Sequence, residues 1–355
     1  MNIHFIINSL AGGGAERVMA TLANGFSLQS KVSLITFNNG NSYPIDPKVN
    51  RVYLHGGTLK NHTLRSWKNL YSYYRVKENR PDAIVVFMPA NALIVVPIAK
   101  IFGIKVIISE HNNHKANPST KSKWTRKLLY PLANAVTILT SYDLEFFKKM
   151  NQKVVIMPNP IVLPDHVPEF RNRKKNILAA GSFKRLDVKG FERLIKISAP
   201  ILKQHPDWTL TIAGSGGNGI EILRGLSQEL GIEGMIILPG FCKNIQEMMQ
   251  QSQVYALPSK YEGLPMVLME ALSNGMACIA YDCISGPGDL IENKSNGILI
   301  EDQNEELFGE GLKMLISDDE FRNEIASNGP ESMVPYNISN ILERWNKLFN
   351  EIKSN

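Results

Sequence analysis

The stretch 254-VYALPSKYEGLPMVLMEALSNG-275 contains two kinds of secondary structure in succession. Its first residues, VYALPS, form a short apolar run typical of a buried strand. After a loop, Pro265 suits the first turn of a helix that we predict to run to about Asn274, and Gly275 is a typical helix stop. A second apolar run, ACIAYD (277–282), follows at once. A strand, a helix and another strand in this order predict parallel pairing through a crossover helix.

The same alternation extends along the whole chain. Buried parallel strands read as continuous apolar runs joined by helices, so the sequence predicts an α/β protein throughout. The apolar runs are IHFII, KVSLITF, AIVVF, KVIIS, AVTILT and VVIM in the first half, and NILAAG, TLTIAG, MIILPG, VYALPS and ACIAYD in the second.

The length of 355 residues exceeds what one hydrophobic core usually supports and predicts two domains of about 150–200 residues each. Four prolines and a basic cluster interrupt the pattern between residues 157 and 176, which is typical of a domain boundary. We therefore expect domains at residues 1–165 and 170–335. Apolar residues at helical spacing predict a final amphipathic helix over about 336–355, packed on a domain.

Positive charge is concentrated in the first half of the chain. The net charge is +6, but residues 1–170 carry +11 and residues 171–330 carry −5. Most of the excess lies between Lys60 and Lys127, where 13 basic residues face three acidic ones. A domain charged in this way suits an anionic partner.

The sequence also bears on the compartment. MNIHFIINSL at the start has no cationic leader or cleavage site, so we expect a strand, not a signal peptide, and a cytoplasmic protein. The apolar runs are broken by prolines and polar residues, unlike a membrane span of about 20 residues. The cysteines, Cys242, Cys278 and Cys283, show neither a disulfide framework nor zinc spacing.

A glycine-rich loop, NSLAGGGAERV, follows the first predicted strand. Gly13 and Gly14 lead into a helix whose amide groups can face a phosphate or diphosphate. The pattern is not G-x-G-x-x-G, so a nicotinamide cofactor is not expected. A tight turn without a ligand is the alternative.

His111, in ISEHNNH, follows a strand at its carboxyl end, where open parallel sheets bind ligands. Its ring can hydrogen-bond a sugar or a phosphate. A structural role is the alternative, and the three-residue spacing to His114 is a weak metal signal.

The stretch GSFKRLDVKGFERLI places three cations, Lys184, Arg185 and Lys189, in a predicted loop after the first strand of the second domain. Such a group can clamp a diphosphate, with Arg offering bidentate contacts. A solvated basic loop is the alternative.

Two carboxylates flank the start of the helix in the opening stretch. Glu262 lies in the loop before the helix and Glu270 lies inside it, with its side chain directed back toward the helix start. The segment between them, at the positive end of the helix dipole, suits an anionic centre. A ligand with hydroxyl groups on either side of a diphosphate, a nucleotide sugar, matches this arrangement. The predicted backbone contacts are Gly263, Leu264, Pro265, Met266 and Val267.

PSKYEGLPMVLMEAL resembles the E-x7-E motif of glycosyltransferase family 4, and the glycine loop, strand-end histidine, basic loop and closing helix follow in the family's order. The resemblance implies the retaining GT-B fold: two Rossmann-like, doubly wound parallel-sheet domains that face each other across a cleft. It also implies that the N-terminal domain binds the acceptor, that the C-terminal domain binds the nucleotide sugar, and that the closing helix packs back on the N-terminal domain.

The resemblance assigns roles to individual residues. Glu262 would bind hydroxyl groups of the donor sugar and Glu270 the ribose. Arg185 and Lys189 would stabilise the leaving diphosphate, with Lys184 as an alternative because Arg185 precedes Lys189 by four positions where five is common. His111 would lie beside the donor sugar.

SEHNNH together with EGLP resembles bacterial transferases that add N-acetylgalactosamine or related sugars to polyprenyl-diphosphate-linked glycans. We therefore expect transfer of a hexose or N-acetylhexosamine, with N-acetylgalactosamine (GalNAc) as the first candidate, from a UDP-sugar to such a membrane-anchored glycan. The route would be bacterial surface-glycan or glycoprotein-glycan assembly. No cofactor or metal is expected, because the sequence contains no Asp-x-Asp pair.

The segment HTLRSWKNLYSYYRVKENR (62–80) can form a helix with an aromatic stripe next to a basic one. Such a helix suits the surface of an anionic membrane, which would hold the protein at the inner face of the cytoplasmic membrane. The alternative is a helix packed on the first domain with a solvated basic face. The stripes contain Leu64, Trp67, Tyr71 and Tyr74, and Arg65, Lys68 and Arg75.

Two other functions fit parts of the sequence. A nucleotide-sugar epimerase of similar build would share the donor site and need a carboxylate beside the sugar in the first domain, where Glu110 could bind substrate. A nucleic-acid-binding protein would account for the pI near 9.0, but the chain contains no recognisable binding module and its two glutamates would have no role. We expect no nucleic-acid partner.

Overall fold

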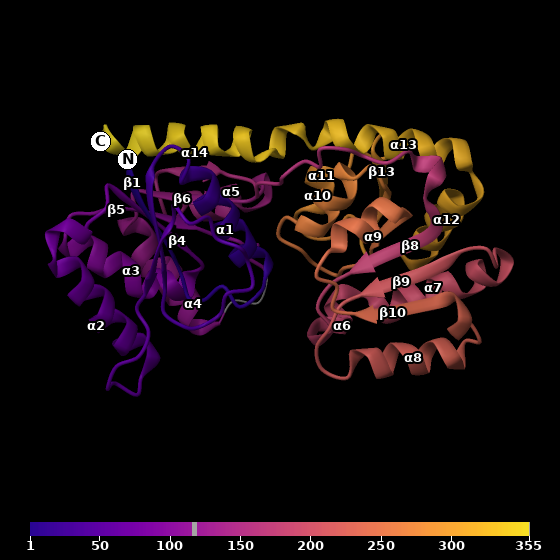
Figure 1. Ribbon diagram of the computed structural model, residues 1–355, viewed down its shortest axis with the longest axis horizontal. Coiled ribbons are helices and arrows are strands. Elements are labelled where there is room, and N and C mark those ends of the chain that lie inside the picture. Colours follow the sequence, from indigo (N-terminus) through magenta and orange to yellow (C-terminus); the bar gives the residue numbers. More distant parts are fainter. Residues whose placement is uncertain (116–118, 355) are drawn as a thin grey trace. The chain divides into compact units, whose positions relative to one another are not determined.

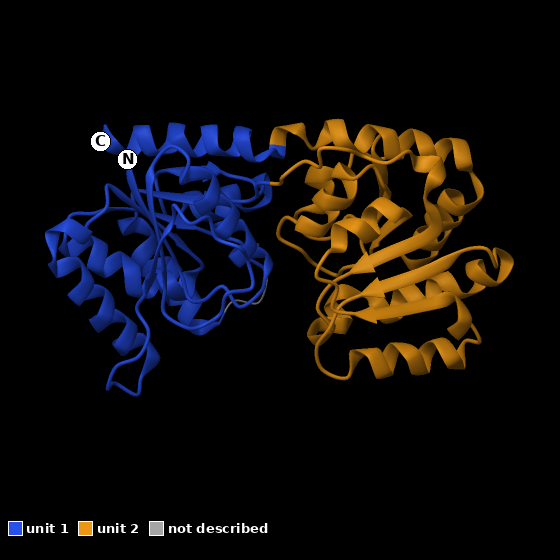
Figure 2. Cartoon of the chain, in the orientation of Figure 1, with its two compact units in different colours: residues 1–160, 336–355 blue, residues 161–335 orange. Residues whose placement is uncertain are grey.

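The computed structural model describes residues 1–115 and 119–354. The chain forms two compact units (Figure 2): unit 1 contains residues 1–160 and 336–355, and unit 2 contains residues 161–335. The division at residue 160 falls inside the proline-rich segment 157–176. No described helix is long and apolar enough to cross a membrane.

Unit 1 is built on a seven-stranded parallel sheet with the order β3-β2-β1-β4-β5-β6-β7. Helices connect the strands (Figure 1). The strands are β1 (Asn2–Ile7), β2 (Lys31–Thr36), β3 (Asn50–Tyr53), β4 (Ala83–Phe87), β5 (Lys105–Ser109), β6 (Ala135–Ile138) and β7 (Val154–Ile156). The helices are α1 (Gly14–Phe26), α2 (His62–Arg75), α3 (Pro89–Ile101), α4 (Thr120–Leu129), α5 (Leu144–Lys148) and α14 (Ile338–Lys353).

Unit 2 repeats the plan with a six-stranded parallel sheet of order β10-β9-β8-β11-β12-β13. Its strands are β8 (Lys174–Ala180), β9 (Thr209–Ala213), β10 (Ile236–Gly240), β11 (Ser252–Leu257), β12 (Ala277–Tyr281) and β13 (Gly297–Ile300). Its helices are α6 (Leu186–Lys189), α7 (Phe191–Gln204), α8 (Gly219–Glu229), α9 (Ile245–Gln251), α10 (Met266–Ser273), α11 (Pro287–Leu290), α12 (Glu305–Ser317) and α13 (Asp319–Ser332).

The two units are Rossmann-like doubly wound domains, as the sequence predicts. Every apolar run predicted as a strand forms one. The central strands are covered on both faces by helices, so their side chains are almost entirely buried, and each unit has its own apolar core. Two strands, β3 and β13, were not predicted.

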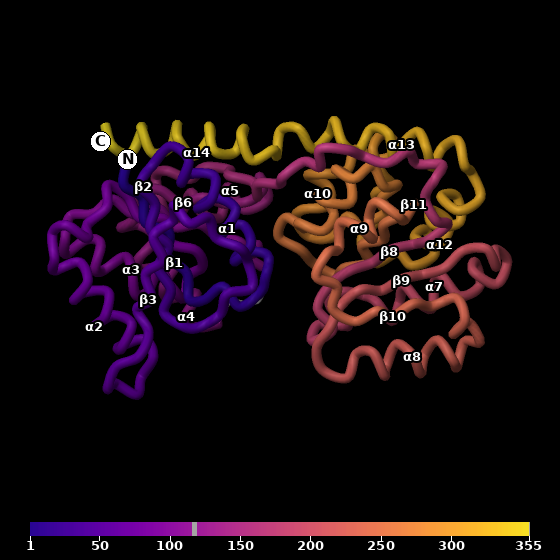
Figure 3. Tube along the Cα trace, viewed as in Figure 1, coloured from indigo at the N-terminus to yellow at the C-terminus, as the bar shows by residue number. Residues whose placement is uncertain are grey.

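The closing helix α14 belongs to unit 1, so both described ends of the chain lie there (Figure 3). Its buried stripe contains Ile341, Trp345, Leu348, Phe349 and Ile352. The Phe349 ring packs edge-on against Phe26 of α1, with ring centroids 5.6 Å apart. The predicted amphipathic helix therefore forms and completes the core of unit 1.

Most of the aromatic stripe on α2 is a packing face. Tyr74 is fully buried, and its hydroxyl lies 2.9 Å from Nδ1 of His4. Trp67 and Tyr71 stack with ring centroids 5.4 Å apart and pack against the core of unit 1. Leu64 is exposed. These placements favour the alternative of a helix packed on its own domain.

Candidate active site

The strand order of unit 2 reverses between β8 and β11, and ligands of open α/β sheets bind at the carboxyl ends of the strands beside such a reversal. The loop after β8 leads into the basic segment, and the loop after β11 leads into Glu262 and α10. The two motifs of the second half of the sequence therefore meet at one edge of the sheet.

A glycine allows the two motifs to approach closely. Gly190, between α6 and α7, has φ of 71°, and a Cβ added there would lie 2.1 Å from the carbonyl oxygen of Pro258. Any other residue at this position would force the basic segment away from the end of β11. The backbone N–H of Lys260 donates to Val188 O at 2.8 Å, and this bond also links the glutamate motif to the basic segment.

Lys189 and Glu262 form an ion pair across this approach. Lys189 Nζ donates to Glu262 Oε1 at 2.7 Å, and the two side chains are only 15% and 13% exposed. An ammonium group carries three donors, so Lys189 can bond Glu262 and a phosphate oxygen at the same time. The structure thus brings together two predicted site residues that are far apart in sequence.

The other two predicted cations lie at the surface of the same segment. Arg185 Cζ lies 5.6 Å from the centre of the Tyr261 ring, next to Glu262. The side chain of Lys184 covers Gly216, where an added Cβ would lie 2.7 Å from its Cγ. Arg185 is thereby the one held beside the glutamate motif. The predicted loop is in fact a 3₁₀ turn (Phe183–Arg185) followed by the single turn of α6.

Glu270 lies inside α10 and is buried, at 3% exposed. The helix begins at Met266 with Pro265 at its N-cap, and it ends at Ser273, close to the predicted limits. Tyr255 of β11 lies near both motif carboxylates. Burial raises the pKa of Tyr255 well above its usual value, and the charges of Glu262 and Glu270 add to the rise.

The start of α10 is fixed by its neighbours. Ser285 has φ of 68°, a strained value for a residue other than glycine, and its hydroxyl donates to Gly263 O at 3.1 Å. Next to it, Gly286 approaches so closely that an added Cβ would lie 2.4 Å from the same carbonyl. The predicted backbone segment from Gly263 to Val267 is therefore held in place by the loop after β12.

The far end of α10 is held by a buried cation that sequence reasoning missed. Arg173 donates from Nη1 to Gly275 O at 2.9 Å and from Nη2 to Asn274 O at 2.8 Å. These carbonyls carry the negative end of the helix dipole, which a cation stabilises. Burial lowers the pKa of Arg173 to about 10. The sequence contains little indication of this role, because Arg173 lies in a cluster of basic residues, and such clusters are usually exposed to solvent.

In unit 1 the strand order reverses between β1 and β4. The loop after β1 carries the glycines. Gly13 N–H donates to the hydroxyl of Tyr43 at 3.0 Å, which in turn donates to Gly13 O at 2.9 Å. A Cβ on Gly13 would lie 2.4 Å from a carboxylate oxygen of Glu16. The N–H of Gly13 is already bonded, and a negative charge lies beside it. Both observations favour a turn without a ligand at Gly13 and Gly14, not an anion site.

His111 lies at the carboxyl end of β5. Its ring stacks on Phe87 at 4.1 Å, and Nε2 lies 3.1 Å from Ser109 Oγ. Burial lowers the pKa of His111 to about 3, although a hydrogen bond with Asn159 acts in the opposite direction. The imidazole is therefore neutral near pH 7 and suited to hydrogen bonding.

The neighbouring histidine has a different role. His114 bonds Asp143 Oδ1 through its backbone N–H at 2.8 Å and through Nδ1 at 2.7 Å, and its ring stacks on Phe146. These bonds tie His114 to the turn after β6. Across the described residues, no group of three or more His, Cys, Asp and Glu side chains could hold a metal ion.

Glu110 lies in a buried hydrogen-bond network. It is 1% exposed; Arg126 donates to its two oxygens at 2.7 and 3.1 Å, and the Tyr130 hydroxyl makes a further, short hydrogen bond. A carboxylate in such a buried network has a structural role, which favours a structural task for Glu110 over the predicted substrate contact. The network instead anchors the residue before His111 to α4.

Met88 is a second residue that the sequence did not reveal. It follows β4 directly and has φ of 73°, which is rare for a side chain of its size. The Asn112 side chain lies 3.8 Å from its sulfur. Strained residues concentrate at functional sites, and this one lies at the reversal point of the unit 1 sheet.

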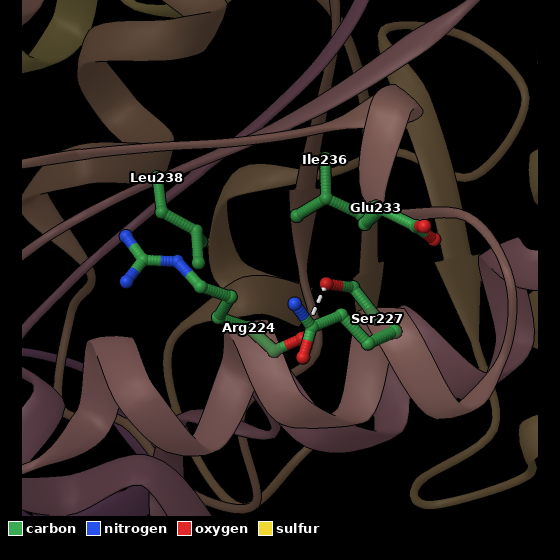
Figure 4. Close-up of a pocket in the computed structure, with 6 residues that line it drawn as sticks. Arg224, Ser227, Glu233, Ile236 and Leu238 are labelled. Atoms are coloured by element: carbon green, nitrogen blue, oxygen red, sulfur yellow. Dashed lines mark hydrogen bonds between the residues drawn. The ribbon is translucent and has the colours of Figure 1, made fainter.

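A pocket of about 200 Å³ between α8 and β10 lies elsewhere (Figure 4). Its lining includes Ile236, at the amino end of β10, and Glu233 just before it. The pocket is therefore at the opposite end of that strand from the edge that carries the motifs, and it is not part of the candidate active site.

Two family models cover the chain. The model described as "Glycosyltransferase Family 4" matches residues 12–163, and the model described as "Glycosyl transferases group 1" matches residues 165–332. Together they account for both units.

Curated relatives match over nearly their whole length. A Campylobacter jejuni protein named "GalNAc-alpha-(1->4)-GalNAc-alpha-(1->3)-diNAcBac-PP-undecaprenol alpha-1,4-N-acetyl-D-galactosaminyltransferase" is 30% identical over 100% of this chain and 99% of its own. A second protein of that organism, "N-acetylgalactosamine-N,N'-diacetylbacillosaminyl-diphospho-undecaprenol 4-alpha-N-acetylgalactosaminyltransferase", is 31% identical over 89% of this chain and 90% of its own. The amylovoran biosynthesis glycosyltransferase AmsD of Erwinia amylovora is 32% identical over 95% and 96%.

Solved structures share the fold. Sucrose-phosphate synthase from Thermosynechococcus elongatus has a TM-score of 0.85 at 16% identity and covers 99% of both chains. Anabaena HepE in complex with UDP has a TM-score of 0.81 at 16% identity and covers 99% of this chain and 100% of its own.

Proposed function

Because the chain belongs to the family 4 glycosyltransferases of GT-B fold, we propose that it transfers an N-acetylhexosamine or hexose, with GalNAc as the first candidate, from a UDP-sugar to a polyprenyl-diphosphate-linked glycan. The observation that carries the proposal is the Lys189–Glu262 pair beside the start of α10. The pair supports the proposal because a cation suited to a phosphate and a carboxylate suited to a sugar hydroxyl lie within one hydrogen bond of each other.

The names of the relatives support the choice of substrates. Two of them are named as N-acetylgalactosaminyltransferases acting on undecaprenol-diphosphate-linked glycans. Structures with the same fold were solved with UDP, and one of them with UDP and GlcNAc. An acceptor carried by a membrane lipid would require the protein to work at a membrane surface, and we place it at the inner face of the cytoplasmic membrane.

The residues of unit 2 have distinct proposed tasks. As the glycosidic bond of the donor breaks, negative charge develops on the diphosphate, and Lys189, Arg185 and the amides at the start of α10 stabilise it. Glu262 accepts hydrogen bonds from hydroxyl groups of the transferred sugar. Glu270 accepts them from the ribose. We propose that these cations remove the need for a divalent metal.

His111 of unit 1 keeps its proposed role as a hydrogen-bonding partner of the transferred sugar. Its low pKa makes the neutral ring the relevant form, so it acts as a neutral donor or acceptor. Retention at the anomeric carbon is proposed from family membership. The epimerase alternative is not favoured, because Glu110 is committed to Arg126 and Tyr130.

The test has two stages. In thermal unfolding, UDP and UDP-GalNAc should raise the midpoint in proportion to their binding, because a ligand that binds only the native state stabilises it by mass action. Mass spectrometry of a short undecaprenyl-diphosphate glycan, incubated with UDP-GalNAc and enzyme, should then show the mass of one added N-acetylhexosamine. No stabilisation by any nucleoside diphosphate or nucleotide sugar would refute the donor site. Conversion of the donor sugar without any acceptor would indicate the epimerase.

A further inference from the structure

Helix α4 of unit 1 exposes an apolar stripe. Trp124, Leu128 and Leu132 follow one another at four-residue intervals and are 56%, 59% and 46% exposed. Residues with this spacing lie on the same side of a helix, and Leu132 continues the row in the 3₁₀ turn (Tyr130–Leu132) that follows. A tryptophan and two leucines in one row are more than the scattered apolar residues of an ordinary surface.

The stripe is not needed for folding, because the helix is anchored by its other face. Thr125, Arg126 and Tyr130 are buried there, at 2%, 4% and 0% exposed. Arg126 binds the buried carboxylate of Glu110, and the Tyr130 ring packs with Phe147 at 5.9 Å. The outer face is thus held rigidly while its apolar side chains remain in water.

Positive charges border the stripe. Lys121, Lys123 and Lys127 are exposed on the same helix, and Lys127 Nζ lies 5.7 Å from the Trp124 ring. The sequence has no acidic residue from 111 to 142. Lys121 Nζ also donates to Thr63 Oγ1 at 3.1 Å, which brings the start of α2 beside α4. Leu64, next to Thr63, is also exposed.

We propose that this surface, formed by α4 and its following turn, docks on an anionic lipid bilayer, with Trp124, Leu128 and Leu132 in the interface and the lysines at the headgroups. An apolar row flanked by lysines is the composition of an interfacial helix. Tryptophan is favoured at that depth because its ring is apolar and its N–H is polar. A second copy of the chain docked through the same surface would bring like charges together, so the charge favours lipid.

This assignment rests on the proposed function, since a lipid-linked acceptor requires contact with a membrane. It differs from the sequence-based expectation, which placed the contact on α2. The aromatic rings of α2 pack against the core of unit 1, whereas the Trp124 ring on α4 is exposed. Since Arg126 on the inner face of α4 holds Glu110, the helix that faces lipid also anchors the residue before His111.

The four tryptophans make the contact measurable in the whole protein. Trp208 and Trp345 are 1% exposed, so only Trp124 and Trp67 can report on lipid. Vesicles of phosphatidylcholine and phosphatidylglycerol that carry brominated acyl chains should quench the emission of the wild type and of Trp67→Phe. Trp124→Phe should lose most of the quenching. Quenching lost in Trp67→Phe and kept in Trp124→Phe would overturn the assignment in favour of α2.

Charge reversal tests the lysines. The triple variant Lys121→Glu, Lys123→Glu, Lys127→Glu should weaken co-sedimentation with anionic vesicles by at least about tenfold, because each basic residue near anionic lipid contributes to binding. The matched control Arg75→Glu, Lys77→Glu, Lys100→Glu makes the same change of charge on exposed residues at the carboxyl ends of α2 and α3 and in the turn after α2, and it should bind far better. Equal weakening in both variants would overturn the proposal.

Two further outcomes are decisive. Dimerisation that Trp124→Ala abolishes, without any binding of the wild type to anionic vesicles, would assign the surface to a second copy of the chain and overturn the proposal. Vesicle binding through Trp124 in a protein that binds no UDP would leave this surface standing and refute the proposed function, because the vesicle assay needs neither donor nor acceptor.

Discussion

Lys189 Nζ lies 2.7 Å from Glu262 Oε1, although the two residues are 73 positions apart in the sequence. The pair exists because parallel strands deliver their following loops to one edge of the sheet and because Gly190 lets those loops approach. It joins the basic motif to the glutamate motif. Loss of either member should therefore affect catalysis more than folding.

The first prediction concerns Lys189. Lys189→Met should lower kcat by about a hundredfold, the usual effect of removing one preorganised charge-stabilising donor. Steady-state kinetics with the lipid-linked acceptor measure it. Lys196→Met, which removes an exposed lysine on α7, is the control and should leave kcat unchanged. A normal rate in Lys189→Met would mean that the basic segment is merely solvated.

The second prediction separates the two glutamates. Glu270→Ala should weaken the binding of both UDP and UDP-sugar, because we place Glu270 on the ribose. Glu262→Ala should leave UDP affinity nearly unchanged while lowering turnover, because its proposed partner is the transferred sugar. Isothermal titration with UDP distinguishes the two variants, and unchanged UDP affinity in Glu270→Ala would contradict the ribose assignment.

Arg173 provides a third, structural prediction. Arg173→Met removes two hydrogen bonds to carbonyls at the end of α10, and leaving buried polar groups unpaired costs about 1–3 kcal/mol each. We expect a loss of about 2–4 kcal/mol in the free energy of unfolding, measured with urea. The matched control is Arg171→Met, an exposed residue of the same basic cluster, which should change it by less than about 0.5 kcal/mol. Equal stabilities would remove Arg173 from the support of α10.

How far the sequence predicted this fold depended on whether each strand contains a continuous apolar run. Central strands such as β4 are buried on both faces, and their continuous apolar runs identified them. The edge strand β3, with the sequence NRVY, has no buried residue, so it lacks the run on which prediction depends. The edge strand β13, GILI, begins with a glycine, so its apolar run is shorter than the four residues that mark a strand.

In the candidate site, side-chain contacts between residues far apart in sequence were not predictable. The sequence predicted a common site for Glu262, Glu270 and Lys189, and the structure brings Lys189 and Glu262 together because parallel strands deliver their following loops to one edge of the sheet. The burial of Glu110 could not be predicted from the sequence. Its partners, Arg126 and Tyr130, lie in a helix and a turn further along the chain. The helical spacing of Tyr74 likewise placed it in a surface stripe, whereas in the structure its hydroxyl contacts His4 in the interior.

The fourth prediction is that catalysis does not require a divalent metal. The motivation is that Lys189 and Arg185 already supply positive charge at the proposed diphosphate site. Activity should survive dialysis against EDTA and should not rise on addition of magnesium or manganese. Loss of activity with EDTA and its return with either ion would contradict this prediction.

The fifth prediction concerns pH and His111. Its pKa is lowered from 6.5 to about 3 by burial, and that of His4 is lowered similarly. The two histidines therefore bind protons near pH 6.5 in the unfolded chain but only near pH 3 in the native protein. Stability from each histidine is complete above pH 6.5 and declines as the pH falls toward 3, by up to about 1.4 kcal/mol per pH unit.

His111→Asn should remove one of these two contributions. In urea unfolding between pH 6 and 4.5, the free energy of unfolding of the variant should change less steeply with pH than that of the wild type. The expected difference in slope is about 1.4 kcal/mol per pH unit, which corresponds to one proton. Because the ring is already neutral, the variant should lower turnover without changing the shape of the kcat profile between pH 5.5 and 8.5. An unchanged stability slope, or a kinetic ionisation near pH 6.5 that disappears in His111→Asn, would mean that the imidazole is solvated and titrates normally in the native protein.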